Sequence, residues 1–244
     1  MPKSAKDVTF ESEHLKVLVI GTYGTGKSTF ASTFPTPGFV FNFDNRILTY
    51  AGRDWDYEDY PWDWRGWVKF EKDLIELKKN ISNYKTVVVD STTSMSDLAM
   101  QRALMLDPKR SPTGGPIWNV HYMMVRHLVE GKLRQIVDLP CNVVVLSHIS
   151  IQKDEDTGTI VDVGPLLTGQ LSEIIPGLFH EVYFATTKRM QNKTQWLLQT
   201  VPIGFFKARS TLSGREARLP DFIPNDYNEL MKHLKKGGED AKKE

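Results

Sequence analysis

A glycine-rich segment near the N-terminus carries the residue types that bind phosphate groups. The segment GTYGTGKST spans residues 21–29 and has the spacing Gly-x-x-x-x-Gly-Lys-Ser. Its glycines let the backbone turn tightly and aim successive N–H groups at phosphate oxygens. Lys27 is predicted to reach the β- and γ-phosphates of a nucleoside triphosphate, and Ser28 to ligate Mg²⁺. The candidate nucleotide contacts are Gly21, Thr22, Tyr23, Gly24, Thr25, Gly26, Lys27, Ser28 and Thr29.

Two aspartates that end apolar runs are the candidate acids of the same site. Asp90 closes the run TVVVD, where an ionised carboxylate is costly unless it faces a cation. Asp90 is therefore predicted to hold Mg²⁺ together with Ser28, through a water molecule. Ser91 follows in place of the glutamate that many ATPases carry there, so Asp44, at the end of GFVFNFD, is the candidate that orients the attacking water. The alternative for either aspartate is a cap on the element that follows it.

A histidine ends another apolar run. His148 follows NVVVLS, where it could contact the γ-phosphate and report it to the segment that follows. The alternative is a histidine in the core or on the surface. His148, Asp44 and Asp90 meet only if their runs are neighbouring parallel strands, because the carboxyl ends of such strands share one edge of a sheet. With Lys27 they form the candidate catalytic set.

The elements that must position these side chains alternate along the chain. Apolar runs rich in β-branched or aromatic residues predict buried strands at 15–20, 38–43, 86–90 and 142–147. Helical patterns between them cover 27–33, 64–79, 94–105 and 117–137. The alternation predicts an α/β fold with a mainly parallel central sheet flanked by helices.

The sequence pattern changes after residue 180, from long alternating strands and helices to short strand-like runs. These runs predict antiparallel strands added at one edge of the sheet, before a final capped helix within 221–236. The remaining segment, 237–244, begins with two glycines and has no large apolar residue, so it is expected to be disordered. Residues 1–236 are therefore predicted to form a single domain. The likeliest flexible loops are 107–116 and 152–164.

The composition indicates the cellular compartment of the protein but does not indicate a binding partner. The net charge of +1 gives no overall basic field for nucleic acid, so such a contact would have to be local. The single cysteine, Cys141, excludes an internal disulfide, agrees with a reducing compartment and is expected to be buried. No segment approaches the roughly 18 apolar residues that span a bilayer, so a cytoplasmic protein without membrane contact is expected.

Four motifs together resemble the core of RecA-like ATPases. GTYGTGKST, VVVDS, VVLSH and FFKARS are similar to the reduced form of that core found in phage single-strand annealing ATPases of the Sak group, over residues 15–235. The resemblance implies an ATP- and Mg²⁺-dependent hydrolase that binds single-stranded DNA and promotes annealing or strand pairing as a homo-oligomer, either a ring or a filament. A single-stranded-DNA-binding protein is a further candidate partner, and a phage-encoded protein would act in the host cytoplasm.

The resemblance also implies roles for particular residues. Asp44 occupies the place of the water-positioning carboxylate, which is usually a glutamate, and His148 that of a sensor, usually a glutamine. The sensor would couple the γ-phosphate to a DNA-binding loop at 149–168. Lys207 and Arg209 match the two basic residues that contact the nucleotide of the neighbouring subunit, and their alternative is a solvated strand face.

Direct contacts to single-stranded DNA would combine basic and aromatic side chains. The candidates are Lys109, Arg110 and Lys153, with solvated surface charges as the alternative. An aromatic cluster between 54 and 67 is interleaved with acids that repel phosphate, which favours a lid or subunit contact over base stacking. Its aromatic members are Trp55, Tyr57, Tyr60, Trp62, Trp64 and Trp67. Trp118 and Trp196 are expected to be ordinary core or edge residues.

Two other functional classes remain open. A small-molecule phosphotransferase of the nucleotide-kinase type closes an arginine-rich lid over the phosphates, and the segment 149–168 contains no arginine. A nucleotide-switched interaction module would bind ATP and turn it over poorly. No Asn/Thr-Lys-x-Asp tetrapeptide follows NVVVLSH, as it does in guanine-selective enzymes, so ATP is the preferred nucleotide.

Overall fold

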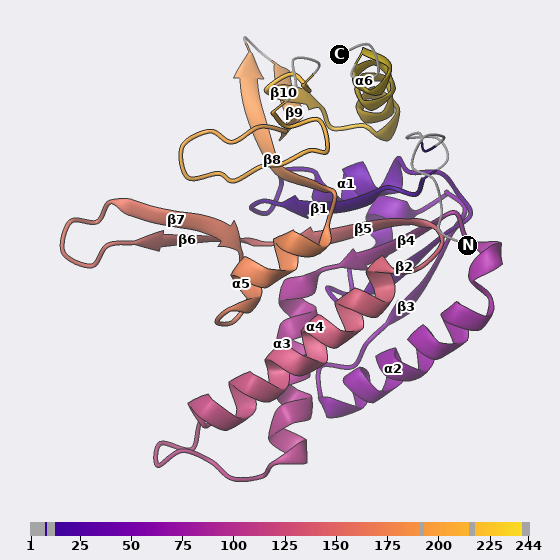
Figure 1. Cartoon of the computed structure of the whole chain (residues 1–244). Coiled ribbons are helices and arrows are strands. Elements are labelled where there is room, and N and C mark those ends of the chain that lie inside the picture. The colour runs from indigo at the N-terminus through magenta and orange to yellow at the C-terminus, as the bar shows by residue number, and fades with distance from the viewer. Residues whose placement is uncertain (1–7, 9–12, 191–192, 215–217, 241–244) are drawn as a thin grey trace.

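An eight-stranded sheet runs through the centre of the molecule (Figure 1). The computed structural model describes residues 8, 13–190, 193–214 and 218–240. The strand order is β10-β9-β8-β1-β5-β4-β2-β3, with β9 and β10 antiparallel to their neighbours and the others parallel. The strands are Lys16–Ile20 (β1), Gly38–Asn42 (β2), Trp55–Asp59 (β3), Thr86–Asp90 (β4), Asn142–Ser147 (β5), Glu181–Met190 (β8), Lys193–Gln199 (β9) and Phe222–Pro224 (β10). This confirms the predicted mainly parallel α/β sheet with antiparallel strands added at one edge.

The four strands predicted from apolar runs lie side by side. In β1, β2 and β4 every residue is buried, as expected of parallel strands that are covered on both faces. Successive side chains enter opposite layers: Val87 and Val89 pack in one core and Val88 in the other. The register places Asn42 beside Asp90, so the carboxyl ends of β2 and β4 meet.

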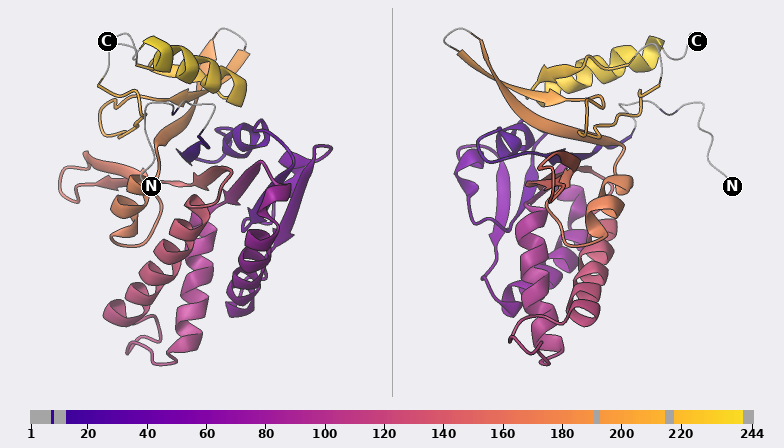
Figure 2. Two further views of the ribbon diagram at one scale, coloured as in Figure 1. Left: turned by 45° about the vertical axis from the view of Figure 1, so that its right-hand side comes forward. Right: turned by 90° about the vertical axis from the view of Figure 1, so that its left-hand side faces the viewer.

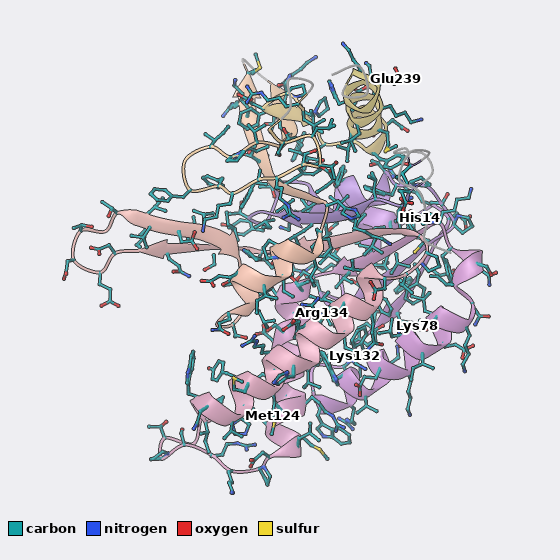
Figure 3. The ribbon with its side chains drawn as sticks, in the orientation of Figure 1. His14, Lys78, Met124, Lys132, Arg134 and Glu239 are labelled. Carbon is teal, nitrogen blue, oxygen red and sulfur yellow. The ribbon has the colours of Figure 1, made fainter. Side chains whose placement is uncertain are left out.

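Three long helices cover one face of the sheet: α2 (Trp64–Lys79), α3 (Thr92–Leu106) and α4 (Met123–Val137). α2 has the predicted bounds because Asp63 caps its first turn, accepting a hydrogen bond from the Arg65 backbone N–H, and because its apolar stripe is buried. Ion pairing and hydrogen bonding tie α4 to α2. Lys132 lies 2.8 Å from Glu71, and Lys78 donates to Gln135 at 2.8 Å (Figure 3).

The expected single helix over 117–137 is wrong at its start. A π-helical turn, η4 (Trp118–Tyr122), precedes α4. His121 in this turn is buried: its Nδ1 accepts from the Ile117 N–H at 2.8 Å, and its Nε2 lies 2.9 Å from the Asp107 carbonyl oxygen. The predicted loop at 107–116 lies between this turn and α3 and contains neither helix nor strand.

The other face of the sheet is covered by α1 (Lys27–Ser32), the 3-10 turn η2 (Ile47–Tyr50) and α6 (Tyr227–Asp240). Phe30 of α1, Tyr50 of η2 and Leu230 of α6 share one apolar cluster with this face. Figure 2 shows the C-terminal elements, in yellow and orange, at one end of the molecule and α3 and α4 at the other. The short helical turns η3 (Ile81–Asn83), α5 (Leu171–Ile174) and η5 (Ile175–Leu178) connect the larger elements. Cys141 is buried with a free thiol, as predicted.

The segment predicted to be a flexible loop at 152–164 is largely a hairpin. β6 (Ile149–Lys153) pairs antiparallel with β7 (Ile160–Pro165), and the hairpin projects from the carboxyl edge of the sheet (Figure 1). Alternating β-branched residues in both arms explain the pairing, since this pattern favours strands over loops. The acidic residues Asp154, Glu155 and Asp156 lie in the tip between the arms.

The C-terminal helix begins later and ends later than predicted. β10 takes 222–224, and Asp226 caps α6 by accepting from the Asn228 and Glu229 N–H groups at 2.8 and 3.3 Å. The expected disorder from residue 237 is wrong for 237–240, which are helical. Gly237 is buried one turn after Leu234, so the packed face of the helix continues over the glycines. Residues 241–244 lie outside the described residues.

The aromatic cluster between 54 and 67 divides between core and surface. Trp55, Tyr60 and Trp67 are buried and pack in the two cores, so a lid or subunit contact is wrong for these three. Trp55, at the start of the edge strand β3, packs in one core, whereas Tyr60, just after β3, and Trp67 of α2 pack in the other. The other members of the cluster are exposed and keep the predicted contact role open: Tyr57, Trp62 and Trp64.

Candidate nucleotide-binding site

The glycine-rich segment forms a tight loop between β1 and α1. Gly24 and Gly26 have φ of 75° and 82°, in the left-handed region that glycine adopts without strain. Gly26 immediately precedes α1, so the first turn of that helix presents its free N–H groups and positive dipole end to the loop. The segment therefore has the strand, loop and helix arrangement that the phosphate-binding motif requires.

Lys27 is buried and folded back on the loop. Its Nζ donates to the carbonyl oxygens of Gly21 and Thr22, both at 2.8 Å. Burial lowers the pKa of Lys27, and the charges of Asp90 and Asp44 act in the opposite direction. The ammonium group thus lies at the mouth of the loop, where phosphate oxygens could replace the two carbonyl oxygens as its acceptors.

Ser28 and Asp90 are brought together from elements 62 positions apart: the Ser28 Oγ donates to Asp90 Oδ2 at 2.7 Å. The hydroxyl of Tyr50 also lies 3.4 Å from the same carboxylate oxygen. Burial and the neighbouring charge of Asp44 raise the pKa of Asp90 to about 6, although Ser28, Lys27 and Tyr50 act in the opposite direction. A buried carboxylate with a raised pKa lacks sufficient positive charge around it.

These donors fit a magnesium ion bound with a triphosphate. A carboxylate and a hydroxyl oxygen are hard ligands of the kind Mg²⁺ takes, with phosphate oxygens and water completing its shell. Ser28 and Asp90 would hold the ion, which would supply the charge that the Asp90 carboxylate lacks. In the described part of the chain, no three His, Cys, Asp or Glu side chains gather into a separate metal site.

Asp44 lies beside Asp90 in a very different environment. Its backbone N–H donates to the Asp90 carbonyl at 3.0 Å, and its Oδ1 accepts from the hydroxyls of Ser91 and Ser94 at 2.8 and 2.5 Å. Burial alone would raise the pKa of Asp44, but the interactions with His148, Ser94 and Ser91 lower it to about 2. Asp44 is therefore a fixed, ionised acceptor at neutral pH.

His148 meets Asp44 as the parallel arrangement predicts. Its Nε2 lies 3.6 Å from Asp44 Oδ2. Its backbone N–H donates to Thr93 Oγ1 at 3.2 Å, and its carbonyl oxygen accepts from the Leu166 N–H at 2.7 Å. His148 thus connects the carboxyl edge of the sheet to both ends of the β6–β7 hairpin base.

A cavity of about 330 Å³ joins these side chains. It is lined by Lys27, Ser28, Asp90, Asp44 and His148, so four of the six candidate catalytic residues lie together at one edge of the sheet, while Lys207 and Arg209 do not line it. Of the predicted nucleotide contacts, Gly21, Thr22 and Thr25 are not among the residues that line the cavity, and Thr25 Oγ1 donates to the Thr22 carbonyl within the loop at 2.8 Å. The remaining wall is formed by Tyr23, Gly24, Gly26, Thr29, Arg46, Thr49 and Trp196.

Sequence reasoning missed several of these residues. Arg46 and Thr49 follow Asp44 in the chain, and their place after the strand was the available signal. Ser91 and Ser94 sit one helical turn apart at the start of α3, a spacing that puts both hydroxyls on the same side. A glutamate in place of Ser91 would set another carboxylate against Asp44. No local signal pointed to Trp196.

Trp196 was expected to be an ordinary core or edge residue, and this is wrong. It is half exposed on β9, lines the cavity, and donates its indole N–H to the Gly24 carbonyl at 3.1 Å. Trp118, under the same expectation, is exposed on η4. β9 reaches the phosphate loop because β8 pairs with β1, a long-range pairing that places the C-terminal strands beside the loop.

Lys207 and Arg209 do not join the site of their own chain. Lys207 Nζ lies 2.5 Å from Asp162 Oδ1 of β7, and the Arg209 guanidinium donates to the Phe179 carbonyl. Both side chains are largely exposed. Their predicted contact with the nucleotide of another subunit stays a prediction.

The three candidate DNA contacts lie on two separate projections. Lys109 and Arg110 are in the loop after α3, where Arg110 donates to the carbonyls of Leu104, Asp107 and Lys109, close to the end of that helix. Lys153 ends β6, beside the acidic tip of the hairpin (Figure 1). These three residues therefore do not form one continuous basic surface within a single subunit.

The fold and the site together define a P-loop ATPase. A mainly parallel α/β sheet presents a phosphate loop, the hydrogen-bonded Ser28–Asp90 pair and an ionised carboxylate at one edge. The family AAA_24, described as an AAA domain, matches residues 13–212. The chain belongs to this AAA-domain family, and its use of ATP with Mg²⁺ follows from that class.

Two solved structures match the chain at low sequence identity. A KaiC-like protein from Pyrococcus horikoshii OT3 is 16% identical over 81% of this chain and 82% of its own, with a TM-score of 0.46. The flagellar accessory protein FlaH from Methanocaldococcus jannaschii is 9% identical over 86% and 83%, with a TM-score of 0.42. No curated protein matches the sequence. Among the described residues, no helix combines the length and apolar content needed to cross a bilayer.

Proposed function

We propose that the protein hydrolyses ATP in a homo-oligomer that binds single-stranded DNA and promotes its annealing or pairing. The observation that carries the hydrolytic step is Asp44, ionised and fixed within the cavity that holds Lys27 and Ser28. A carboxylate with a pKa of about 2 is a weak base, so Asp44 orients the attacking water by accepting its hydrogen bond.

The other residues of the edge have complementary roles in this proposal. Lys27 leaves the carbonyls of Gly21 and Thr22 and contacts the β- and γ-phosphates. Ser28 and Asp90 hold the metal ion, which stabilises charge on the phosphates. His148 contacts the γ-phosphate and, through its bonds to the hairpin base, relates the state of the nucleotide to β6 and β7.

An oligomer supplies what one subunit lacks at the γ-phosphate. Lys207 and Arg209 are exposed away from their own cavity, at a spacing that suits two cations reaching a neighbouring site. Release of the exposed Lys207–Asp162 pair costs little, because surface ion pairs contribute roughly 0–1 kcal/mol. A repeating assembly would also align the two projections that carry Lys109, Arg110 and Lys153, which gives single-stranded DNA a repeated rather than a continuous basic surface.

The test is ATP hydrolysis with and without single-stranded DNA, duplex DNA and RNA at two salt concentrations. Selective stimulation by single-stranded DNA, weakened by salt, supports the proposal. A triple variant, Lys109→Ala, Arg110→Ala and Lys153→Ala, should lose that stimulation and keep basal turnover, whereas the exposed Lys72→Ala on α2 should keep both. An ATPase that no polymer stimulates would contradict the DNA role.

The nucleotide-kinase alternative has less support. An arginine-rich lid would come from the segment after β5, and that segment forms a hairpin with an acidic tip. Acidic residues there would repel the phosphates that such a lid covers. The switch-module alternative differs in turnover: it predicts that Asp44→Asn leaves the hydrolysis rate unchanged.

A further inference from the structure

Trp196 comes from the C-terminal strand β9 and yet forms a wall of the nucleotide cavity. It shares that cavity with Lys27, Ser28 and Thr29, and 48% of the residue is exposed. Most of the other cavity side chains are polar or charged. The indole therefore offers an apolar face next to a site that otherwise binds charge.

One hydrogen bond from the ring and close packing against Gly26 hold this indole in place. Its N–H donates to the Gly24 carbonyl at 3.1 Å, while Asn225 donates its backbone N–H to the Trp196 carbonyl at 3.1 Å and its amide to the Gly26 carbonyl at 2.8 Å. A Cβ on Gly26 would lie 3.0 Å from Trp196 Cδ1. The ring is thus packed directly on the outer side of the phosphate loop.

Tyr23, the other aromatic side chain that lines the cavity, is less suited to hold a ligand. The residue is 87% exposed. Ordering a free side chain on binding costs about 0.5–1.5 kcal/mol, a cost that a ring already fixed in place largely avoids. Trp196 is the preorganised aromatic surface of the cavity.

We propose that Trp196 stacks on the base of the bound nucleotide and supplies the base-dependent part of its affinity. The inference rests on the proposed binding of ATP at the phosphate loop. A nucleobase has a planar face that an indole can cover, and every base has one, so stacking strengthens binding without reading base identity. Trp196 should therefore favour ATP and GTP alike over inorganic tripolyphosphate, which carries the phosphates without a base.

The experiment compares dissociation constants for Mg-ATP and Mg-tripolyphosphate by calorimetry, using the full chain. Trp196→Leu should weaken ATP binding about tenfold, at the low end of base–aromatic stacking, and leave tripolyphosphate unchanged. Trp196→Phe keeps an aromatic face without the N–H donor and should recover most of the ATP affinity. Trp118→Leu, at an exposed tryptophan on η4, is the matched control and should change neither ligand.

The two ligands separate stacking from a change in the phosphate loop. An equal loss for ATP and tripolyphosphate would mean that Trp196 acts only on loop shape, and it would overturn the proposal, as would an unchanged ATP affinity. Wild-type protein gives a second measurement that does not depend on a variant folding: ATP should bind more tightly than tripolyphosphate and quench tryptophan fluorescence more. Equal affinity and equal quenching overturn the stacking role, whereas binding of neither ligand contradicts the proposed function itself.

Discussion

The phosphate loop is bounded by two regions that contribute in different ways. On one side, the parallel strands β5, β4 and β2 bring His148, Asp90 and Asp44 to a common edge. On the other side, the antiparallel strands β9 and β10 bring Trp196 and Asn225 against the backbone of the loop. The parallel side holds the charged groups that could act on phosphates, and the C-terminal side contacts the backbone of the loop.

Two carboxylates at the same edge of the sheet have different electrostatic environments. Asp44 and Asp90 are adjacent, yet the pKa of Asp44 is lowered to about 2 and that of Asp90 is raised to about 6. Hydroxyl donors and His148 surround the first carboxylate, while the second is more deeply buried. This separation agrees with the proposed roles, in which Asp44 orients water and Asp90 holds the metal ion, because a nearby cation favours the ionised form of Asp90.

The largest effect should come from the residue between the two regions. Lys27→Ala removes the ammonium group from the phosphates and should lower kcat/KM for ATP by about 10³-fold or more. A steady-state phosphate-release assay measures it, with exposed Lys72→Ala as the control. Near-normal turnover would show that the nucleotide is hydrolysed elsewhere.

Asp44→Asn tests the parallel side. The substitution keeps the size of the side chain and removes its charge, so kcat should fall about 10²-fold while the affinity for ATP changes little. Single-turnover hydrolysis and calorimetric binding measure the two quantities. Asp54→Asn, in the exposed turn before β3, should change neither, and an unchanged kcat in Asp44→Asn would favour the switch-module alternative.

The C-terminal region should act on a neighbouring subunit. Lys207→Ala with Arg209→Ala should lower kcat by about 10²-fold, as the loss of a positioned charge donor does, and leave ATP binding nearly intact. Mixing these chains with Lys27→Ala chains should restore part of the turnover, since each supplies what the other lacks. Absence of any recovery in an assembled mixture would argue that the two residues do not act between subunits.

The smallest effect concerns stability without ligand. Because the folded pKa of Asp90 is raised from 3.8 to about 6, its contribution to stability is complete below pH 4 and is lost as the pH rises through 6. A pKa difference of about 2 corresponds to about 3 kcal/mol over the range from pH 4 to pH 6, of which about half falls above pH 5. Asp90→Asn should therefore flatten the increase of stability between pH 7.5 and pH 5.

Urea unfolding in EDTA, at pH 5 and at pH 7.5, measures the free energy of unfolding of the wild-type protein and of Asp90→Asn. Asp44 acts with the opposite sign: its stabilising contribution is present above pH 4 and is lost as the pH falls toward 2. Asp44→Asn should therefore leave the change between pH 5 and 7.5 nearly intact. If Asp90→Asn keeps the wild-type pH dependence, the buried carboxylate is not its source.

The sequence by itself determined the phosphate loop and the parallel side of the site. A Gly-x-x-x-x-Gly-Lys-Ser spacing after an apolar run has few structural solutions, and strands that end in polar residues must share an edge when they are parallel neighbours. Lys27, Ser28, Asp44, Asp90 and His148 could therefore be found from local pattern. The helix over 64–79 was predictable for the same reason, since its cap and apolar period are local.

Only the tertiary structure decided the C-terminal side and the environments of the acids. Trp196 reaches Gly24 across 172 positions, and Asn225 reaches Gly26 across 199. Such contacts depend on β8 pairing with β1, which no short-range pattern specifies. The helical conformation of residues 237–240 likewise follows from the packing of α6. Local sequence sets the conformations a segment can adopt, whereas contacts distant in sequence select the neighbours and the electrostatic surroundings of each side chain.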